Sequence, residues 1–411
     1  HISLDRDSAA SGNDQTWNNT SPTSTEFTVG GTLDTNASGN NYVAYIFAHD
    51  DQSFGTGSDE AIIKCDSYSG SSSEVEVNLG FEPQWLLFKC SSTSSSWSIV
   101  DNMRGLSDQV TPRLRPHLNN AEQYASPAPV KITSTGFIVT NTHSDYNTSG
   151  QTFIYMAIRR PHKPPTAGTE VFDVGLRSGS SSDAKTNSSI LTDMSFILRR
   201  DSSSEYNGIS SRLQGPNSLK TNSNSAELTG WLDSSTPWAH MTGIMIGGSN
   251  GAANTGNLID FSFKRAAGFF DVVTYSSVTT TTYADIPHNL EVQPELVIIK
   301  YRDGTLGWHV WSTTISQMGY LHRDLAFNTY PDNQTQYSSV FYNTDPTDTT
   351  FRIGTSSASN NQGGSPYKYV AYLFASLSGI SKVGTYSGTG SNVNVDCDFT
   401  AGARVVMIKR T

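Results

Sequence analysis

The sequence predicts an all-β protein made of tandem β-sandwich-like domains of about 100–110 residues, arranged in a rod or strip. Apolar residues alternate with polar ones, as at 75–79 and 393–397, and no segment carries the apolar stripe of an amphipathic helix. Two strand-like motifs also recur along the chain, roughly 105 residues apart. That spacing is too long for a solenoid repeat and suits a whole small domain. A closed barrel is the alternative architecture for each domain.

The first recurrent motif is a run of apolar residues that ends in a basic residue. It occurs at residues 84–89, 195–199, 295–300 and 404–409. An unbroken apolar run predicts a strand in the interior of a sheet. In two copies a tryptophan, Trp97 or Trp308, stands eight residues after the basic end. We expect a hairpin whose second strand places this tryptophan in the core.

The second recurrent motif is rich in aromatic residues and stands in the other half of each interval. It occurs at residues 42–48, 153–158, 369–375 and, more faintly, 258–264. We expect it to form the closing strand of each repeat. Turn-rich loops separate about six to eight short strands in one unit, which is typical of a β-sandwich.

The two motifs together divide the chain into repeat units. These are a partial unit (second half) at 1–60, a repeat unit at 61–162, a divergent repeat unit at 168–266, a repeat unit at 268–377 and a partial unit (first half) at 378–411. Each complete unit is long enough to bury its own core, so we expect a string of separate domains. Only 162–166, with two prolines, is typical of a linker, and the other joints are too short to bend freely.

Both ends of the chain fall within a repeat unit, which would leave strand edges without partners. We therefore expect these 411 residues to be an excerpt from a longer polypeptide. The alternative is a mature chain whose two partial units pair with each other or with a neighbouring molecule.

The composition excludes some classes of partner. Charged residues make up only 16% of the chain, and Ser, Thr, Asn and Gly take their place, so we expect a neutral, hydroxyl-rich surface. The net charge of −10 argues against nucleic acid, because phosphate binding needs clustered Lys and Arg. No apolar run approaches the roughly 18 residues that span a bilayer, so we expect no membrane insertion.

The sequence carries no motif of a known catalytic site, such as GxSxG, HExxH, a P-loop or GxGxxG before a helix. The nine histidines are scattered without metal-ligand spacing. A catalytic pair of carboxylates would be expected in one distinctive domain, not in a series of similar ones. We therefore predict a protein that is not an enzyme and that has no catalytic residues, no bound metal and no cofactor.

One polar motif resembles the first half of a calcium-binding loop, with oxygen ligands at alternate positions before a glycine. Its candidate ligands are Asp34 and Asn36 in one copy and Asp145 and Asn147 in another. The glutamate that would complete such a loop is missing after Asp145, and Asx-rich turns use the same residue types for geometric reasons. A turn is the expected structure, and calcium binding is the alternative.

The divergent unit at 168–266 is the place where we expect a special contact. Trp231 and Trp238 lie in this unit and could stack on sugar rings if their side chains are exposed. These two tryptophans are the candidate ligand-binding residues. Trp97 and Trp308, in contrast, occupy the same position in two repeats and are expected in the core.

Four segments carry a resemblance to a known kind of domain: 22–30 (Pro-Thr-Ser-Thr-Glu-Phe-Thr-Val-Gly), 37–48, 83–89 and 384–388. Together they resemble a tandem β domain of large virion structural proteins of tailed bacteriophages, especially marine ones. The resemblance covers most of the chain and is weakest at 170–260. It implies a component of the particle surface, such as a tail or head fibre, a decoration protein or an adhesin, and it supplies no catalytic residues.

We therefore expect a bacteriophage virion structural protein, a fibre, appendage or decoration component that has other virion proteins as partners and forms a homo-oligomer. One alternative is a glycan-binding adhesin for host attachment, in which repeated modules strengthen weak contacts with host-surface glycans. A polysaccharide depolymerase is the other alternative.

Overall fold

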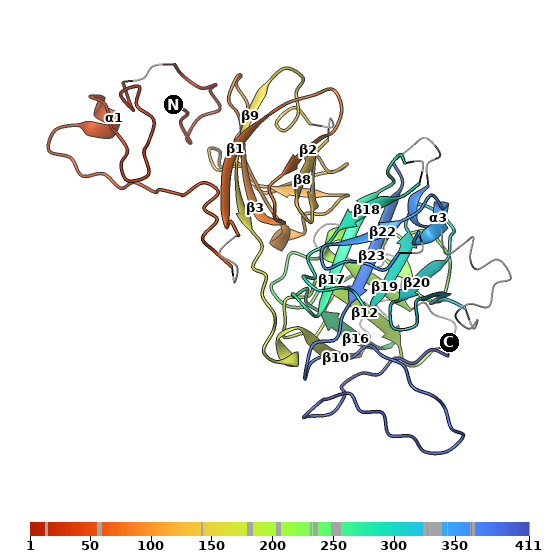
Figure 1. Ribbon diagram of the computed structural model, residues 1–411. Coiled ribbons are helices and arrows are strands. Elements are labelled where there is room, and N and C mark those ends of the chain that lie inside the picture. Colours follow the sequence, from red (N-terminus) through yellow and green to blue (C-terminus); the bar gives the residue numbers. More distant parts are fainter. Residues whose placement is uncertain are drawn as a thin grey trace. The chain divides into compact units, whose positions relative to one another are not determined.

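The computed structural model describes residues 1–12, 15–55, 60–140, 143–178, 184–202, 207–230, 232, 237–247, 256–280, 282–323, 327, 339–342, 344–361, 363 and 366–410. Within these residues antiparallel sheets dominate and every helix is short (Figure 1). The prediction of an all-β chain with sandwich-like domains is confirmed. No helix in this part of the chain has the length and apolar character needed to cross a membrane.

The chain divides into two compact units. The first contains residues 1–101, 110–131 and 136–160, and the second contains residues 102–109, 132–135 and 161–411. Each of the three complete repeats contributes all the strands of one main sheet. In each main sheet the closing strand lies between the opening strand and the apolar strand, so the two recurrent motifs are neighbours in space.

The repeat at 61–162 forms a main sheet with the strand order β1–β9–β3–β4 and a smaller sheet with the order β2–β8–β7. The main strands are β1 (Ile63–Ser69), β9 (Thr152–Arg159), β3 (Pro83–Cys90) and β4 (Ser98–Asp101). The smaller elements are β2 (Val75–Asn78), β8 (Gly136–Val139), β7 (Val130–Thr133), the pair β5 (Thr111–Arg113) and β6 (Gln123–Ala125), and the 3-10 helix η1 (Asn102–Arg104).

Aromatic side chains fix these two sheets face to face. Phe137 on β8 lies edge-on to Phe88 on β3 and to Tyr155 on β9, with ring centroids 5.3 Å apart in both pairs. All three rings are buried. Because side chains alternate along a strand, the buried residues of β9 (Phe153, Tyr155 and Ala157) share this inner face.

The other two complete repeats have main sheets with the orders β10–β16–β12–β13–β14 and β17–β23–β19–β20–β21. The divergent repeat contains η2 (Gly168–Glu170), β10 (Phe172–Ser178), β11 (Ala184–Lys185), β12 (Met194–Arg199), β13 (Gly208–Ser211), η3 (Arg212–Gln214), β14 (Leu219–Lys220), β15 (Met245–Ile246) and β16 (Asn257–Phe263). The third repeat contains β17 (Phe270–Ser276), β18 (Ala284–Pro287), β19 (Leu296–Tyr301), β20 (Trp308–Ser312), β21 (Gln317–Tyr320), β22 (Thr350–Ile353), α3 (Ser357–Asn360) and β23 (Lys368–Phe374). In addition, β11 pairs with β15, and β18 pairs with β22.

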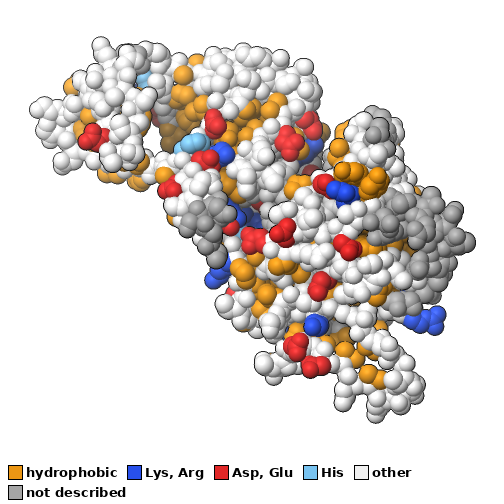
Figure 2. All heavy atoms as spheres, viewed as in Figure 1, with side chains coloured by type: hydrophobic (Ala, Val, Ile, Leu, Met, Phe, Trp, Pro, Cys, Tyr) orange, Lys and Arg blue, Asp and Glu red, His pale blue; other side chains and the backbone are white. Residues whose placement is uncertain are grey.

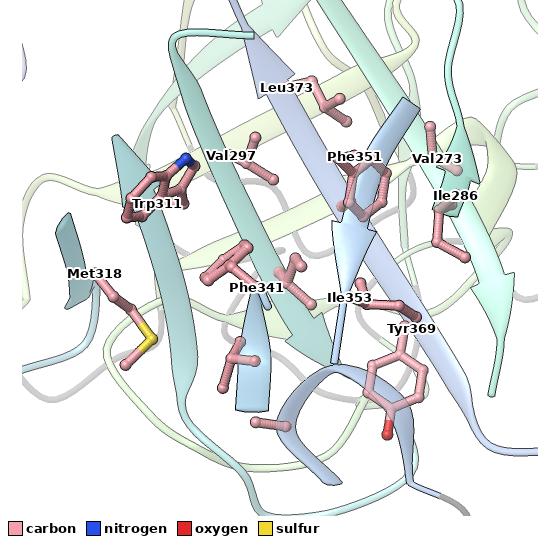
Figure 3. Packing of buried hydrophobic residues seen from close by; sticks show 14 of the residues in the cluster. Val273, Ile286, Val297, Trp311, Met318, Phe341, Phe351, Ile353, Tyr369 and Leu373 are labelled. Atoms are coloured by element: carbon pink, nitrogen blue, oxygen red, sulfur yellow. The ribbon is translucent and has the colours of Figure 1, made fainter. Parts of the chain in front are cut away.

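The main sheet of the third repeat is buried on both faces, as its unbroken apolar strands require. Along β19, Val297 and Ile299 belong to one apolar cluster, whereas Ile298 belongs to another. The first cluster is the repeat's own core. Phe351 and Ile353, on β22 of the smaller sheet, cover it on one side (Figure 3).

The second cluster is shared between two repeats. From the divergent repeat it takes Val171, Phe172, Met194, Ile209, Leu219 and Ala266, and from the third repeat it takes Phe269, Phe270, Val272, Ile298, Trp308, Val310, Phe327, Val370 and Tyr372. Each of these two repeats also buries a cluster of its own, as expected, and the shared cluster joins them into one compact unit in place of two separate domains. The physical reason is that the main sheet has two apolar faces. Its own repeat buries one of them, and the neighbouring repeat must bury the other.

The two partial units do not continue this pattern within the described residues. Neither 42–48 nor 404–409 forms a regular strand, and most of their large apolar side chains are exposed. The short helix α1 (Leu33–Asn36) is the regular element of the N-terminal partial unit.

The shared cluster predicts that the divergent and third repeats lose structure together. Phe270 is fully buried in this cluster, so Phe270→Ala should cost about 3–5 kcal/mol of unfolding free energy. Hydrogen exchange should show faster opening of both β16 and β23. As a control, Val139→Ala in the first repeat should leave both strands as protected as before. Loss of protection confined to β23 would contradict a shared core.

Candidate functional site at the junction of two repeats

Lys300, the basic residue near the end of β19, is fully buried. Its Nζ donates hydrogen bonds to the backbone carbonyls of Tyr301 at 2.7 Å, Asn224 at 3.3 Å and Gly304 at 3.5 Å. Asn224 belongs to the preceding, divergent repeat. Burial lowers the pKa of Lys300 to about 8, against the opposing effect of the negative charge on Glu227. The amine thus remains mostly protonated at neutral pH and keeps all three donors for these carbonyls.

Trp308, the first residue of β20, contacts the same stretch of the divergent repeat. Its indole N–H donates to the carbonyls of Lys220 at 2.9 Å and Ser223 at 3.1 Å. Its ring stacks on Tyr372, with centroids 6.3 Å apart. Trp308 is fully buried, which confirms the expectation that this tryptophan is a core residue. The core that it fills is the one shared by two repeats. We call the buried lysine and tryptophan, together with the carbonyls that they bind, the junction clamp.

A second junction clamp is present in the first repeat. Lys89 is fully buried and donates to the carbonyls of Cys90 at 2.7 Å and Asp7 at 3.1 Å. Trp97 is also buried, as expected, and its indole N–H donates to the carbonyl of Ser3 at 2.9 Å. Burial lowers the pKa of Lys89, as it does for Lys300. In both clamps the lysine and the tryptophan therefore hold a segment that precedes their own repeat.

The remaining two copies of the basic residue behave differently from each other. Lys409, at the end of the last apolar motif, donates to the carbonyl of Arg323 at 2.6 Å, and Arg323 again lies in the preceding repeat. In the divergent repeat the lysine is replaced by Arg199, which is paired with Asp201 of the same repeat. The contact with a preceding repeat thus occurs at each lysine copy of the motif.

A buried ionic network lies beside the clamp of Lys300. Arg302 is almost fully buried and forms ion pairs with Asp108 and Glu227. Side-chain amides also donate hydrogen bonds to the carboxylate of Glu227. The distances are 3.0 Å from Gln214, 3.1 Å from Gln109 and 3.2 Å from Asn217. Gln214 also accepts a hydrogen bond of 2.7 Å from the Tyr372 hydroxyl. All of these residues lie in the second compact unit.

Burial and charge act in opposite directions on these acids. Burial raises the pKa of Asp108, and the adjacent Arg302 only partly offsets this effect. Burial also tends to raise the pKa of Glu227, but the charge of Arg302 and the hydrogen bonds from Arg302, Gln214 and Asn217 lower it overall. For Arg302 itself burial would lower the pKa, but the two acids raise it, so the guanidinium stays charged. The network therefore depends on one cation that neutralises buried carboxylates.

The joint between repeats is a hydrogen-bonded turn that occurs twice. Ala266 bridges to Phe270 at the start of the third repeat, and Leu377 bridges to Ser381 at the start of the last partial unit. Gly268 and Gly379 occupy the same place in these turns with φ of 72° and 74°, a conformation that side chains disfavour. These turns thereby connect the closing strand of one repeat directly to the start of the following repeat.

The structure places one candidate ligand-binding tryptophan in a core. Trp238 is fully buried in a cluster of the divergent repeat, its indole N–H donates to the carbonyl of Gly215 at 2.7 Å, and the Arg212 guanidinium lies 5.5 Å from its ring centre. No face of this ring is open to a sugar, so Trp238 is a packing residue. Trp231 lies outside the described residues.

The calcium-loop candidates near the end of the first repeat are bound to protein groups. Asp145 accepts hydrogen bonds from Arg115 at 2.8 Å and from Ser95 at 3.1 Å. The buried Asn147 accepts from the backbone N–H of Ser71 at 2.7 Å and donates to the carbonyl of Ser73 at 2.8 Å. These oxygens and amides hold a turn against the neighbouring loop.

The N-terminal copy of that motif lies in α1. Asp34 is exposed there, and the side-chain amide of Asn36 donates to the carbonyl of Gly30 at 3.0 Å. Across the described ranges, no group of three or more His, Cys, Asp and Glu side chains is arranged to hold a metal ion. The structure does not bring the four candidate ligands together.

One surface pocket of about 290 Å³ lies next to the clamp of Lys300. Its lining includes Asn224, His309, Tyr320, Arg323 and Ser356. The ring of Tyr320 lies 5.0 Å from that of His309, and the Arg323 guanidinium lies 5.1 Å from the Tyr320 ring centre. The pocket thus combines an aromatic ring with several hydrogen-bonding groups.

Sequence reasoning identified the recurrent lysine and tryptophan but not what they bind. It missed Arg302, Glu227 and Gln214 altogether. Arg302 has no counterpart in the first repeat, where Ser91 stands two positions after the basic residue, so no recurrence signals the network. The signal that was available is the coincidence of a basic residue with an unbroken apolar strand, since such a residue must be buried or at an edge.

The fold and its junctions define a modular β protein in which recurrent buried groups join successive repeats. Residues 1–161 and 202–411 match the family described as Domain of unknown function (DUF7483), and the chain belongs to this family. No curated protein and no solved structure matches the chain.

Removal of the central cation should destabilise the second compact unit strongly. Arg302→Met leaves Asp108 and Glu227 buried without a counter-charge, and we expect a loss of about 3–5 kcal/mol in urea denaturation. The matched control is Arg352→Met, which breaks a partly exposed pair with Asp285 and should cost about 1 kcal/mol or less. Similar small losses for both variants would show that the network is not essential to the junction.

His309 should make stability fall in acid. Burial, with nearby His322, Lys300 and Arg323, lowers the pKa of His309 from 6.5 to about 4. Between these values the unfolded chain binds a proton that the native chain does not, so stability is present above pH 6.5 and is lost as the pH falls toward 4. The expected contribution is on the order of 3 kcal/mol.

The check is denaturation of the wild type and of His309→Gln at pH 7 and pH 4.5. The variant should lose less stability on acidification than the wild type. His288 also has a pKa of about 4, is present in both proteins and cancels in the comparison. Identical acid sensitivity would mean that His309 is already protonated in the native protein or that its titration is not linked to folding.

Proposed function

We propose that the chain is a structural component of a bacteriophage virion, namely a fibre, appendage or decoration component built from tandem β domains. The observation that carries the proposal is the junction clamp. In two copies a buried lysine amine and a buried indole N–H hold backbone carbonyls of the preceding segment. A joint of this kind fixes the orientation of one repeat on the next, which a particle appendage needs and a flexible tether would not provide.

The shared core supports the same function. The outer face of the third repeat's main sheet is buried against the divergent repeat and is reinforced by the ion pairs of Arg302. Breaking this joint would expose apolar surface and separate buried charges, and both changes cost free energy. Rigidity between repeats is thus built into their packing, as suits a protein that bears mechanical load or sets a fixed spacing.

The composition and the resemblance also support a role in a particle. Charged residues make up only 16% of the chain, and the many hydroxyl groups can hydrogen-bond across polar interfaces. The segments at 22–30, 37–48, 83–89 and 384–388 resemble domains of phage virion proteins. The partners in this proposal are other virion proteins and further copies of the chain, at the particle surface.

A second candidate function, glycan binding by an adhesin, is favoured by the pocket beside Tyr320. A tyrosine ring can stack on a sugar ring while His309, Arg323 and Ser356 supply hydrogen bonds, and about 290 Å³ can hold a small sugar unit. This function is compatible with the first, because a fibre can also bind a host receptor.

The test is to locate the chain in particles of a phage that encodes it. In purified particles, mass spectrometry should recover peptides from all three complete repeats, and antibodies against the recombinant chain should label the surface of intact particles in electron micrographs. A non-structural phage protein from the same lysate is the control and should be absent. A chain that is abundant in the lysate but missing from the particles would rule out the proposal.

A further inference from the structure

The pocket beside the clamp of Lys300 is formed by two repeats. Asn224 comes from the divergent repeat, and the other described residues of the lining come from the third repeat. The clamp fixes groups on both sides of this joint. Nζ of Lys300 donates to the carbonyl of Asn224 at 3.3 Å, and the backbone N–H of Trp308 donates to Nδ1 of His322 at 3.2 Å.

His322 is neutral at pH 7 and has a defined tautomer. Burial, together with the charges of Arg323 and Lys300, lowers the pKa of His322 to about 4. A neutral imidazole has one acceptor nitrogen and one N–H donor. Because Nδ1 accepts the hydrogen bond from Trp308, the proton of the ring is on Nε2.

Two hydrogen-bond donors lie side by side at the pocket. Nε of Arg323, a residue of the lining, is 3.2 Å from Nε2 of His322. Both nitrogens carry a hydrogen, because the guanidinium stays protonated, so neither can accept from the other. The guanidinium also lies 5.1 Å from the ring centre of Tyr320, a contact that holds it against the lining. One negatively charged oxygen atom beside the two nitrogens can accept from both.

Cations outweigh acids among the described residues at the pocket. Besides burial, the charges of Arg323 and Lys300 lower the pKa of His322. Glu227 acts on Lys300, but its carboxylate is already paired with Arg302. None of the described lining residues is acidic. On the described surface in Figure 2, by contrast, Lys, Arg, Asp and Glu side chains are sparse and mixed. The local charge therefore favours an anion.

A buried nitrogen in the lining also lacks a partner. His309 is 6% exposed, and its Nδ1 makes no hydrogen bond of normal geometry to the described residues. Burial lowers the pKa of this ring, and the nearby backbone of Gly307 only partly opposes that effect. The side chains of Asn224 and Ser357 lie in the same lining and are exposed. An imidazole, an amide and a hydroxyl group are suited to the hydroxyl groups of a sugar.

The size and the apolar part of the pocket favour a single small ring. Leu306, Val340 and Ala358 contribute apolar groups to the lining, which suit the C–H faces of a sugar. A volume of about 290 Å³ is at the lower end of the range for small-molecule sites. The pocket can therefore take one sugar unit but not several.

We propose that this pocket binds one acidic sugar unit of a glycan, a sugar ring that carries a carboxylate or a sulfate. The acidic group accepts hydrogen bonds from Arg323 and His322. The hydroxyl groups of the sugar bind Asn224, His309 and Ser357. The inference rests on the second candidate function, glycan binding, and names the class of ligand for that site.

The experiment measures binding to the 411-residue chain at pH 7 by isothermal titration calorimetry. The probes are methyl β-D-glucuronide, glucose 6-sulfate and the neutral methyl β-D-glucoside. At least one acidic probe should bind at least about tenfold more tightly than the glucoside, because hydrogen bonds to a charged group are stronger than those to a neutral one. The acidic probe that binds more tightly identifies the anionic group.

Two variants test the assignment of the residues. Arg323→Gln should weaken the acidic probe at least about tenfold and remove its advantage over the glucoside. Arg323 is exposed, so the variant should melt like the wild type. Asn224→Ala keeps the carbonyl that Lys300 binds and should weaken all probes that bind by a similar factor, about threefold.

The matched control is Arg352→Gln. The Arg352 guanidinium also lies over a tyrosine ring, 3.8 Å from the centre of Tyr283, but Arg352 is not among the described lining residues. This variant should bind every probe like the wild type.

Three outcomes would overturn the inference. They are acidic probes that do not bind, a glucoside that binds as tightly as they do, and an affinity for the acidic probe that Arg323→Gln leaves unchanged. Binding of the glucoside alone would leave glycan binding in place without an acidic ligand. Absence of binding by all three probes would count against the second candidate function as well. None of these results bears on whether the chain is found in virus particles.

Discussion

The main sheet of the third repeat has apolar residues on both faces, and much of the second compact unit follows from that constraint. One face closes on the strand pair β18–β22, which contributes Ile286, Phe351 and Ile353. The other face has no cover within its own repeat and is buried against the divergent repeat. Because the two sheets must lie against each other, the chain passes between them in a turn of five residues. The divergent and third repeats are therefore separate modules in the sequence, but they fold around a shared core.

Buried polar groups then determine how the two repeats face each other. Lys300 is the second-last residue of β19, and Arg302 directly follows the strand. Both side chains bind groups of the preceding repeat, and Arg302 also binds the segment 102–109. Apolar packing alone tolerates sliding, whereas a buried charge is satisfied only where its partners meet it. We interpret the clamp and the ionic network as determinants of orientation more than of net stability. Their cost in desolvation is visible in the lowered pKa of Lys300.

The sequence allowed the local parts of this structure to be predicted but not the contacts between them. The alternation of residues and the recurrent motifs identified β3, β19, β9 and β23, because strand pairing and burial leave a periodic pattern along the chain. The burial of Trp97 and Trp308 followed from their recurrence. The shared core could not be predicted, because an unbroken apolar strand indicates that both faces are covered but not by which segment. Trp238 shows the same limit, since a single tryptophan gives no sign of whether a core or a solvent surface surrounds it.

The hydrogen bonds that the junction clamps make to the preceding segment go to main-chain carbonyls. The groups bound are those of Ser3 and Asp7 in one clamp and of Lys220, Ser223 and Asn224 in another, which have little in common as side chains. Substitutions in the bound segment thus leave these hydrogen bonds intact, provided that its backbone keeps the same path. The shared apolar cluster and the ion pairs of Arg302, in contrast, depend on particular side chains of the neighbouring repeat, so only the clamp part of the joint is insensitive to the sequence it binds.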